Sequence, residues 1–193
     1  MQKKKIFVLL GNPDSDSFSG TVATTYVDAA KAAGHEVERI NIGDLAFDPI
    51  LHKGYKEIQA LEPDLVRVQE VWKWADHVVI IYPNWWCTMP ALLKGMFDRM
   101  FLPGFAFNFD KQTKKIIQRL SGKSARVIVL AGTHSPFMTW WKFGDFTNEI
   151  AKGILGFAGM KTKVSSYGPC DKVDQECRAK WLKEVAQLGS EAV

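Results

Sequence analysis

The sequence predicts an α/β domain in which a five-stranded parallel sheet carries helices on both faces. Short apolar runs alternate with amphipathic, helix-length segments five times along the 193 residues, which is the order of repeated βαβ units. Two of these runs, Val78 to Tyr82 and Ala125 to Ala131, are continuously apolar, as in parallel strands that are buried on both faces. The length and the hydrophobic content of 47% suit a single domain over residues 1–193 with a substantial core.

The first half of the chain predicts three strands and two helices. Gly34 ends the first helix, because glycine readily adopts the left-handed conformation of a C-terminal cap. Pro49, Gly54 and Pro63 interrupt a long connection over residues 45–63. The expected elements are a strand from Lys5 to Leu10, a helix from about Phe18 to Ala33, a strand from Glu36 to Asn41, a helix from Asp64 to Ala75 and the apolar strand from Val78 to Tyr82.

The second half predicts three helices, two strands and an aromatic loop. Pro90 fits the first turn of a helix, where its missing N–H costs nothing. The expected elements are a helix from Ala91 to Met100, a loop from Pro103 to Phe109, the apolar strand from Ala125 to Ala131, a helix from Gly144 to Phe157, a strand from Lys161 to Tyr167 and a closing helix from Val173 to Leu188.

The segment from Pro83 to Met89, which follows the third strand, holds two adjacent tryptophans, Trp85 and Trp86. In an open parallel sheet, ligands bind outside the carboxyl ends of the strands, and this segment lies there. An isolated tryptophan usually fills a core, whereas two neighbours in a strand-to-helix loop point differently and favour a ligand. Indole rings beside free backbone N–H groups suit a flat aromatic cofactor such as a flavin.

The loop after the first strand, Gly11 to Thr21, carries several hydroxyl side chains and leads into a helix. It matches neither a dinucleotide fingerprint nor a Walker loop. Taken alone, it indicates only an N-cap at Ser17. Beside the aromatic loop it predicts a phosphate site, because a helix N-terminus offers unpaired N–H groups and the positive end of the helix dipole.

A third loop, Gly132 to Pro136, follows the fourth strand at the same edge of the sheet. Gly132 permits a close approach of the backbone to a ligand. Thr133 and His134 carry groups that can donate hydrogen bonds to a cofactor or a substrate. His134 also has a second interpretation, as an ordinary loop histidine.

The remaining composition argues against several classes of function. His35, His52 and His77 are not placed at metal-ligand spacing, so no metal site is expected. Cys87 has no histidine or acid near it in sequence and is interpreted as a packed or cofactor-lining thiol. Three scattered cysteines make no disulfide framework, no apolar run is long enough to span a bilayer, and the net charge of +4 is dispersed. We expect a cytoplasmic protein that binds no nucleic acid.

Three segments resemble the flavodoxin-like NAD(P)H:quinone reductases, the diaphorase and modulator-of-drug-activity group. They are Asn12-Pro13 with Ser17-Phe18-Ser19, the run from Pro83 to Arg99 with its Pro-Ala-Leu-Leu-Lys-Gly helix start, and Gly104-Phe105-Ala106-Phe107. The resemblance covers most of the chain. It implies a flavodoxin-like topology with strand order 2-1-3-4-5, and a homodimeric flavoenzyme that passes a hydride from NAD(P)H to the flavin and then two electrons to a quinone or similar acceptor.

Carried over to this sequence, the resemblance implies a flavin site of three parts. The phosphate side would be held by Asn12, Ser17, Phe18 and Ser19, the ring by Pro83, Asn84, Trp85, Trp86 and Cys87, and the polar edge by Gly132, Thr133, His134 and Ser135. If His134 points inward, it can protonate the acceptor. The chain departs from the family at His134-Ser135, where a Gly-Gly pair is common, and at Trp140, Trp141 and Phe146, near which better-known members have a tyrosine and a histidine. The acceptor, FMN against FAD, and NADH against NADPH therefore stay open.

Two other functions also stay open. A regulatory subunit of the same fold would sense a flavin or nucleotide and control a partner such as a potassium-efflux system, as some relatives do. An electron-carrier flavodoxin is disfavoured by the basic net charge, because such carriers are usually acidic. Robust diaphorase turnover without a partner would favour the enzyme over the regulatory subunit.

Overall fold

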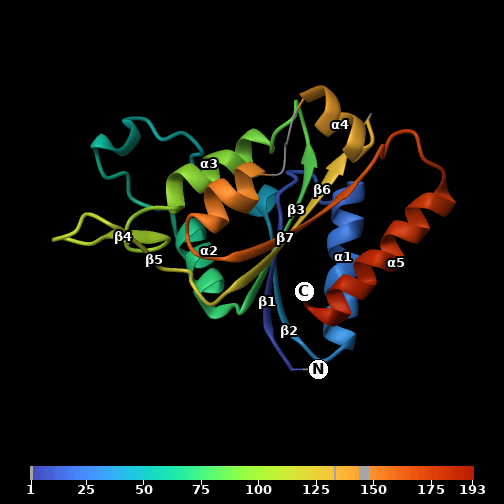
Figure 1. Ribbon diagram of the computed structural model, residues 1–193, viewed down its shortest axis with the longest axis horizontal. Coiled ribbons are helices and arrows are strands. Elements are labelled where there is room, and N and C mark those ends of the chain that lie inside the picture. Colours follow the sequence, from blue (N-terminus) through green and yellow to red (C-terminus); the bar gives the residue numbers. More distant parts are fainter. Residues whose placement is uncertain (1, 133, 144–147) are drawn as a thin grey trace.

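The computed structural model describes residues 2–132, 134–143 and 148–193, which form a central parallel sheet covered by helices (Figure 1). The five strands lie in the order β2-β1-β3-β6-β7. Here β6 and β7 are the fourth and fifth strands of the sequence analysis, so the predicted order 2-1-3-4-5 is confirmed. The strands are β1 (Lys5–Leu10), β2 (Glu36–Asn41), β3 (His77–Asn84), β6 (Ser124–Ala131) and β7 (Lys161–Tyr167).

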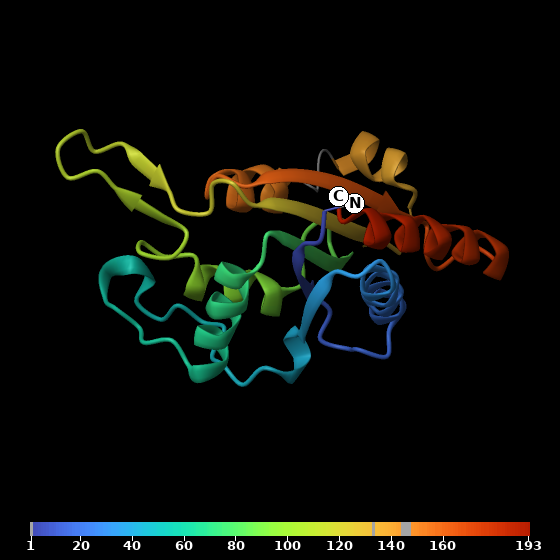
Figure 2. The same ribbon diagram turned by 90° about the horizontal axis from the view of Figure 1, so that it is seen from below.

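Helices cover both faces of this sheet, as the two orthogonal views show (Figures 1 and 2). On one face lie α1 (Phe18–Ala32) and α5 (Gln175–Glu191). On the other face lie α2 (Pro63–Trp74), α3 (Ala91–Met100) and a π-helix, η3 (Glu149–Gly156). The short helix α4 (Pro136–Phe143) lies near the carboxyl end of β6, and two 3₁₀ turns, η1 (Ile42–Asp44) and η2 (Gly54–Lys56), interrupt the connection from β2 to α2.

The alternation of side chains along β1 supplies both cores. Ile6 and Val8 point into the core beneath α1 and α5, whereas Phe7 and Leu9 point into the core beneath α2 and α3. All four are fully buried, and each such side chain contributes about 1.5–3 kcal/mol relative to exposure. Trp72 fills the second core and meets the ring of Phe7 edge-on at 5.6 Å between centroids.

A β-hairpin interrupts the predicted aromatic loop from Pro103 to Phe109. β4 (Phe107–Phe109) and β5 (Ile116–Gln118) pair antiparallel and project away from the sheet (Figure 2). The prediction of a loop over these residues was therefore wrong in its last part. Strands of three residues are too short to show alternation, and the turn between them is set by local polar bonds, with Asp110 Oδ1 accepting the N–H of Thr113 at 2.6 Å.

The predicted helix from Gly144 to Phe157 is corrected in type and extent. Residues 144–147 lie outside the described residues, and Glu149–Gly156 is a π-helix whose Ile150 and Leu155 are fully buried. Helix α4 was not predicted at all. β3 extends two residues beyond its predicted end at Tyr82, so Pro83 and Asn84 belong to the strand rather than to the loop.

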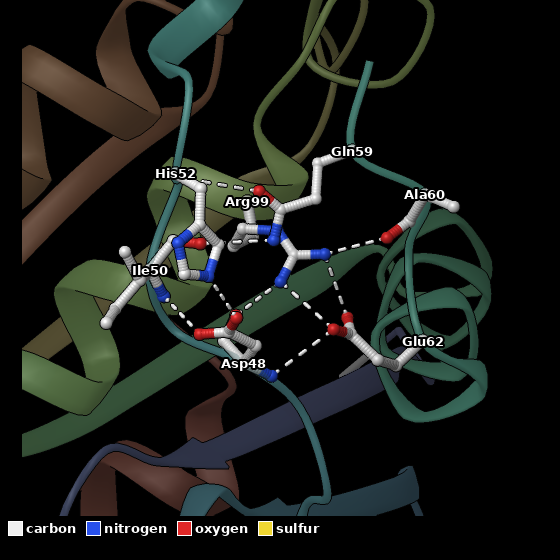
Figure 3. A network of polar contacts seen from close by, with 7 residues as sticks. All are labelled: Asp48, Ile50, His52, Gln59, Ala60, Glu62 and Arg99. Carbon is white, nitrogen blue, oxygen red and sulfur yellow. Dashed lines mark hydrogen bonds and ion pairs between the residues drawn. The ribbon is translucent and has the colours of Figure 1, made fainter. Parts of the chain in front are cut away.

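The long connection from β2 to α2 is fastened to α3 by a buried arginine (Figure 3). The Arg99 side chain is 0% exposed and forms an ion pair with Glu62 at 3.0 Å. It also donates to the carbonyl oxygen of Ala60 at 2.7 Å and to that of Asp48. Burial alone would raise the pKa of Glu62, but the hydrogen bonds from Arg99 hold that pKa below its ordinary value.

Close backbone packing completes this attachment. A Cβ placed on Gly95 of α3 would lie 2.6 Å from the carbonyl oxygen of Pro49, so only glycine lets the connection approach the helix this closely. His52 and Asp48 pair at 2.6 Å on the outer side of the same network. Helix α3, which begins directly after the aromatic segment, is thereby fixed in position.

Candidate functional site

A pocket of about 540 Å³ opens at the carboxyl edge of the sheet. Loops after β1, β3, β6 and β7 meet there, as expected for ligand sites in open α/β sheets. Its lining consists of Ser17, Phe18, Ser19, Pro83, Asn84, Trp85, Trp86, Cys87, Leu130, Ala131, Gly132, His134, Thr139, Cys170 and Asp171. The three predicted loops are thus brought together around one cavity.

Three of the residues expected at the site lie elsewhere or outside the description. Asn12 is 6% exposed and lies beneath the first loop rather than in the pocket wall. Its Nδ2 donates to Ser17 Oγ at 2.8 Å and to Ser19 Oγ at 3.4 Å, so it orients two lining hydroxyls. Ser135 caps α4, where its carbonyl oxygen accepts the N–H of Thr139 at 2.9 Å. Thr133 lies outside the described residues.

The first loop presents the N-terminus of α1 to the pocket. Ser17 is the N-cap, and its Oγ accepts the N–H of Gly20 at 3.3 Å. A Cβ on Gly20 would lie 1.8 Å from the carbonyl oxygen of Ser15, so glycine is required for the loop to fold this tightly over the helix start. The positive end of the helix dipole favours an anionic group such as a phosphate at this N-terminus. The first turn of α1 contains no acidic residue that would repel such a group.

The second loop is a tight turn that presents both tryptophans. Trp85 and Thr88 exchange two backbone hydrogen bonds of 3.0 Å. The two residues between them, Trp86 and Cys87, have φ angles of 53° and 64°, a left-handed conformation that is costly for residues with a side chain. Trp85 is 47% exposed and Trp86 is 98% exposed, so neither indole fills the core.

Asn84 at the end of β3 is a lining residue with a buried acceptor. Its Oδ1 is buried and has no hydrogen-bond partner among the described residues. Such an atom is costly to leave unpaired.

The fourth loop, after β7, was not predicted to line the site. The N–H groups of Cys170 and Asp171 donate to the carbonyl oxygens of Ala131 and Gly132 at 2.8 and 3.0 Å, which fixes the fourth loop against the third. The neighbouring positions of β6 and β7 in the sheet were the only available signal. Burial, helped by the charge of Asp171, raises the pKa of the Cys170 thiol to about 11, so it is a neutral wall residue at pH 7.

Neither a metal centre nor a membrane-spanning helix is found in the described part of the chain. Within residues 2–132, 134–143 and 148–193, no three histidine, cysteine or acidic side chains gather as metal ligands would. Over that same part of the chain, no helix combines the length and apolar character needed to cross a bilayer.

Comparisons with known proteins agree with this architecture. A family model described as a flavodoxin-like fold matches residues 4–187. A relative named NAD(P)H dehydrogenase [quinone] 1, from Rattus norvegicus, is 27% identical over an alignment of 191 positions, which covers 83% of this chain and 67% of the relative.

Two solved structures show the same fold. The NAD(P)H:quinone oxidoreductase from Methanothermobacter marburgensis superposes with a TM-score of 0.81 at 23% identity and covers 100% of both chains. An FMN-dependent NADH-azoreductase from Bacillus anthracis, solved in complex with FMN, gives a TM-score of 0.77 at 19% identity over 99% of both chains.

Proposed function

Because the chain belongs to the family of flavodoxin-like NAD(P)H:quinone oxidoreductases, we propose that it is a flavin-dependent enzyme that reduces a quinone or a similar acceptor with NAD(P)H. One observation carries the proposal. The pocket at the sheet edge combines the N-terminus of α1, whose first turn contains no acidic residue and which suits a phosphate, with two solvent-exposed indoles, which suit a flat ring.

The residues present fit a flavin, either FMN or FAD. Ser17, Ser19 and the start of α1 would hold the phosphate, with Phe18 beside them. Trp85 and Trp86 would pack against the ring, with Asn84 and Cys87 beside it in the pocket lining. Gly132 and His134 line the opposite wall and would face the polar edge. When bound, the flavin would supply the site that accepts a hydride from NAD(P)H.

The contribution of the protein is binding, orientation and proton delivery. Overall, NAD(P)H, a proton and a quinone give NAD(P)⁺ and a hydroquinone. The indoles and the backbone at the strand ends would orient first NAD(P)H and then the quinone in the same pocket. His134 would protonate the acceptor oxygen. Because donor and acceptor would use the same pocket one after the other, the kinetics would be ping-pong. Initial-velocity lines that intersect instead of running parallel would contradict this mechanism.

A homodimer is part of the proposal. A second pocket of about 790 Å³ lies between the connection before α2, helix α3 and the hairpin β4–β5. Phe97, Phe101 and Phe107 line it, while Ile58 and Tyr55 at its edge are 100% and 72% exposed. A contiguous apolar surface of this kind is typical of an interface, and a second copy of the chain is its expected occupant. A monomer at micromolar concentration in light scattering would contradict the dimer.

The proposed location is the cytoplasm, where three free cysteines stay reduced. The proposed acceptor and donor are tested in one anaerobic experiment. The purified protein is mixed with FMN or FAD, NADH or NADPH is added, and menadione follows. Flavin bands that bleach with the nucleotide and return with the quinone, without any added partner protein, support the enzyme. Flavin binding without turnover favours the regulatory subunit, and failure of both flavins to bind contradicts the enzyme and favours a regulatory subunit that senses a nucleotide.

A further inference from the structure

The aromatic turn depends on support from outside its own segment. Trp86 and Cys87 are both in the left-handed region at φ 53° and 64°, which is the pattern of a type I′ turn, where Asn-Gly is the favoured pair. Tryptophan and cysteine gain nothing locally from this conformation, and left-handed residues with side chains persist only where the surroundings enforce them. The two hydrogen bonds between Trp85 and Thr88 close the turn but do not attach it to the rest of the protein.

Glu149 makes that attachment. Its Oε2 accepts the hydroxyl hydrogen of Thr88 at 2.7 Å, and its Oε1 accepts the N–H of Met89 at 3.0 Å. One carboxylate therefore binds two successive residues that lie sixty positions away in the sequence. Hydrogen bonds to a charged acceptor are among the strongest in proteins.

The position of Glu149 makes it a rigid support. It is the first residue of the π-helix η3, where a negative side chain is favoured by the helix dipole. The next residue, Ile150, and Leu155 in the same helix are fully buried in the core beneath α2 and α3. These buried side chains fix the backbone from which the Glu149 side chain reaches the turn. π-Helical turns are often found at functional sites.

We propose that Glu149 is a positioning residue, which holds the Trp85–Cys87 turn in the shape that forms one wall of the pocket. It is not among the described lining residues of the pocket, and its carboxylate binds Thr88 and Met89, which follow the two tryptophans. The expected effect on flavin binding rests on the function proposed above. The contact by which Glu149 holds the turn is independent of that function.

The first test uses the protein without flavin. Amide hydrogen exchange at Thr88 and Met89 should be at least about tenfold faster in Glu149→Ala, because the charged hydrogen bonds that resist opening are lost. Glu176, an exposed acid in the first turn of α5, provides a matched control, and Glu176→Ala should leave both amides unchanged. Exchange in Glu149→Ala that equals the wild-type rate would overturn the proposal.

The second test measures FMN affinity by fluorescence titration. We expect Glu149→Ala to weaken binding about tenfold with little change in Tm, and Glu149→Gln, which keeps one acceptor oxygen, to weaken it less. Thr88→Val removes one of the two contacts, and adding it to Glu149→Ala should cause no further loss. Unchanged affinity in Glu149→Ala, or a loss that Glu149→Gln does not lessen, contradicts the positioning role. Failure of the wild type to bind either FMN or FAD contradicts the proposed function instead, while the exchange test still decides whether Glu149 holds the turn.

Discussion

The two ends of helix α3 are fixed in opposite ways. Near its C-terminal end, Arg99 is buried and donates hydrogen bonds to Glu62 and to the carbonyl oxygens of Ala60 and Asp48. Before its N-terminal end, the turn that carries Trp86 has left-handed backbone and exposes its side chains to solvent. The first arrangement contributes to stability, whereas the second leaves polar and aromatic groups available to a ligand. Backbone strain near α3 therefore lies in the turn that forms the pocket wall, while the helix after this turn is held by buried polar bonds.

The largest effect is expected from breaking the buried end. Replacing Arg99 by methionine keeps much of the volume but leaves Glu62 and the carbonyl oxygens of Ala60 and Asp48 without their donor. Removing one partner of a buried ion pair costs about 3 kcal/mol of unfolding free energy, and urea denaturation measures it. Arg119→Met is the control, because Arg119 is exposed. Equal stability of the two variants would show that the network around Arg99 does not hold the connection to α3.

Acid should lower the stability of the protein through His77, the first residue of β3, at the end of the strand opposite the pocket. Burial first, and then the positive charges of Lys4 and Arg126, lower the pKa of His77 to about 3 from its usual 6.5. Between these two pKa values, His77 is protonated in the unfolded chain and neutral in the folded chain. Stability is full above pH 6.5 and falls as pH decreases towards 3, by at most about 1.4 kcal/mol per pH unit from this group.

Urea denaturation of the wild type and of His77→Gln between pH 7 and pH 4.5 isolates that contribution from the carboxylates, which titrate in both proteins. The loss of stability on acidification should be smaller in the variant. An equal loss in both proteins would mean that His77 does not contribute.

The smallest effect on stability, and a clear one on binding, is expected at the strained end. Trp85→Ala removes a half-exposed indole, so the free energy of unfolding should change little. Stacking of a base on an aromatic side chain contributes about 1–3 kcal/mol, and FMN binding should weaken at least about tenfold on this scale. Trp74→Ala is a control indole outside the pocket lining. Binding that is equally strong in Trp85→Ala and wild type would place the ring elsewhere.

The sequence predicted the sheet and most of the pocket lining for physical reasons that operate locally. Continuous apolar runs mark buried parallel strands, so the positions of β3 and β6 and the loops at their carboxyl ends could be inferred. The hairpin β4–β5 and helix α4 were missed because short segments have no readable periodicity. Cys170 and Asp171 reach the pocket only because β7 lies beside β6. The contact between Glu149 and Thr88 could not be predicted, because nothing in the sequence indicates that these two distant residues meet.

Thiol protection in the unaltered protein shows whether the pocket at the sheet edge receives the flavin. Cys87 lines the pocket, whereas Cys177 lies on α5 outside its lining, and both are free and partly exposed. Alkylation with N-ethylmaleimide is followed at each cysteine by peptide mass spectrometry. With FMN at a hundred times its Kd, alkylation of Cys87 should slow by about two orders of magnitude, as mass action requires for competing ligands, and that of Cys177 should not change. Unprotected Cys87 under saturating FMN would contradict the account.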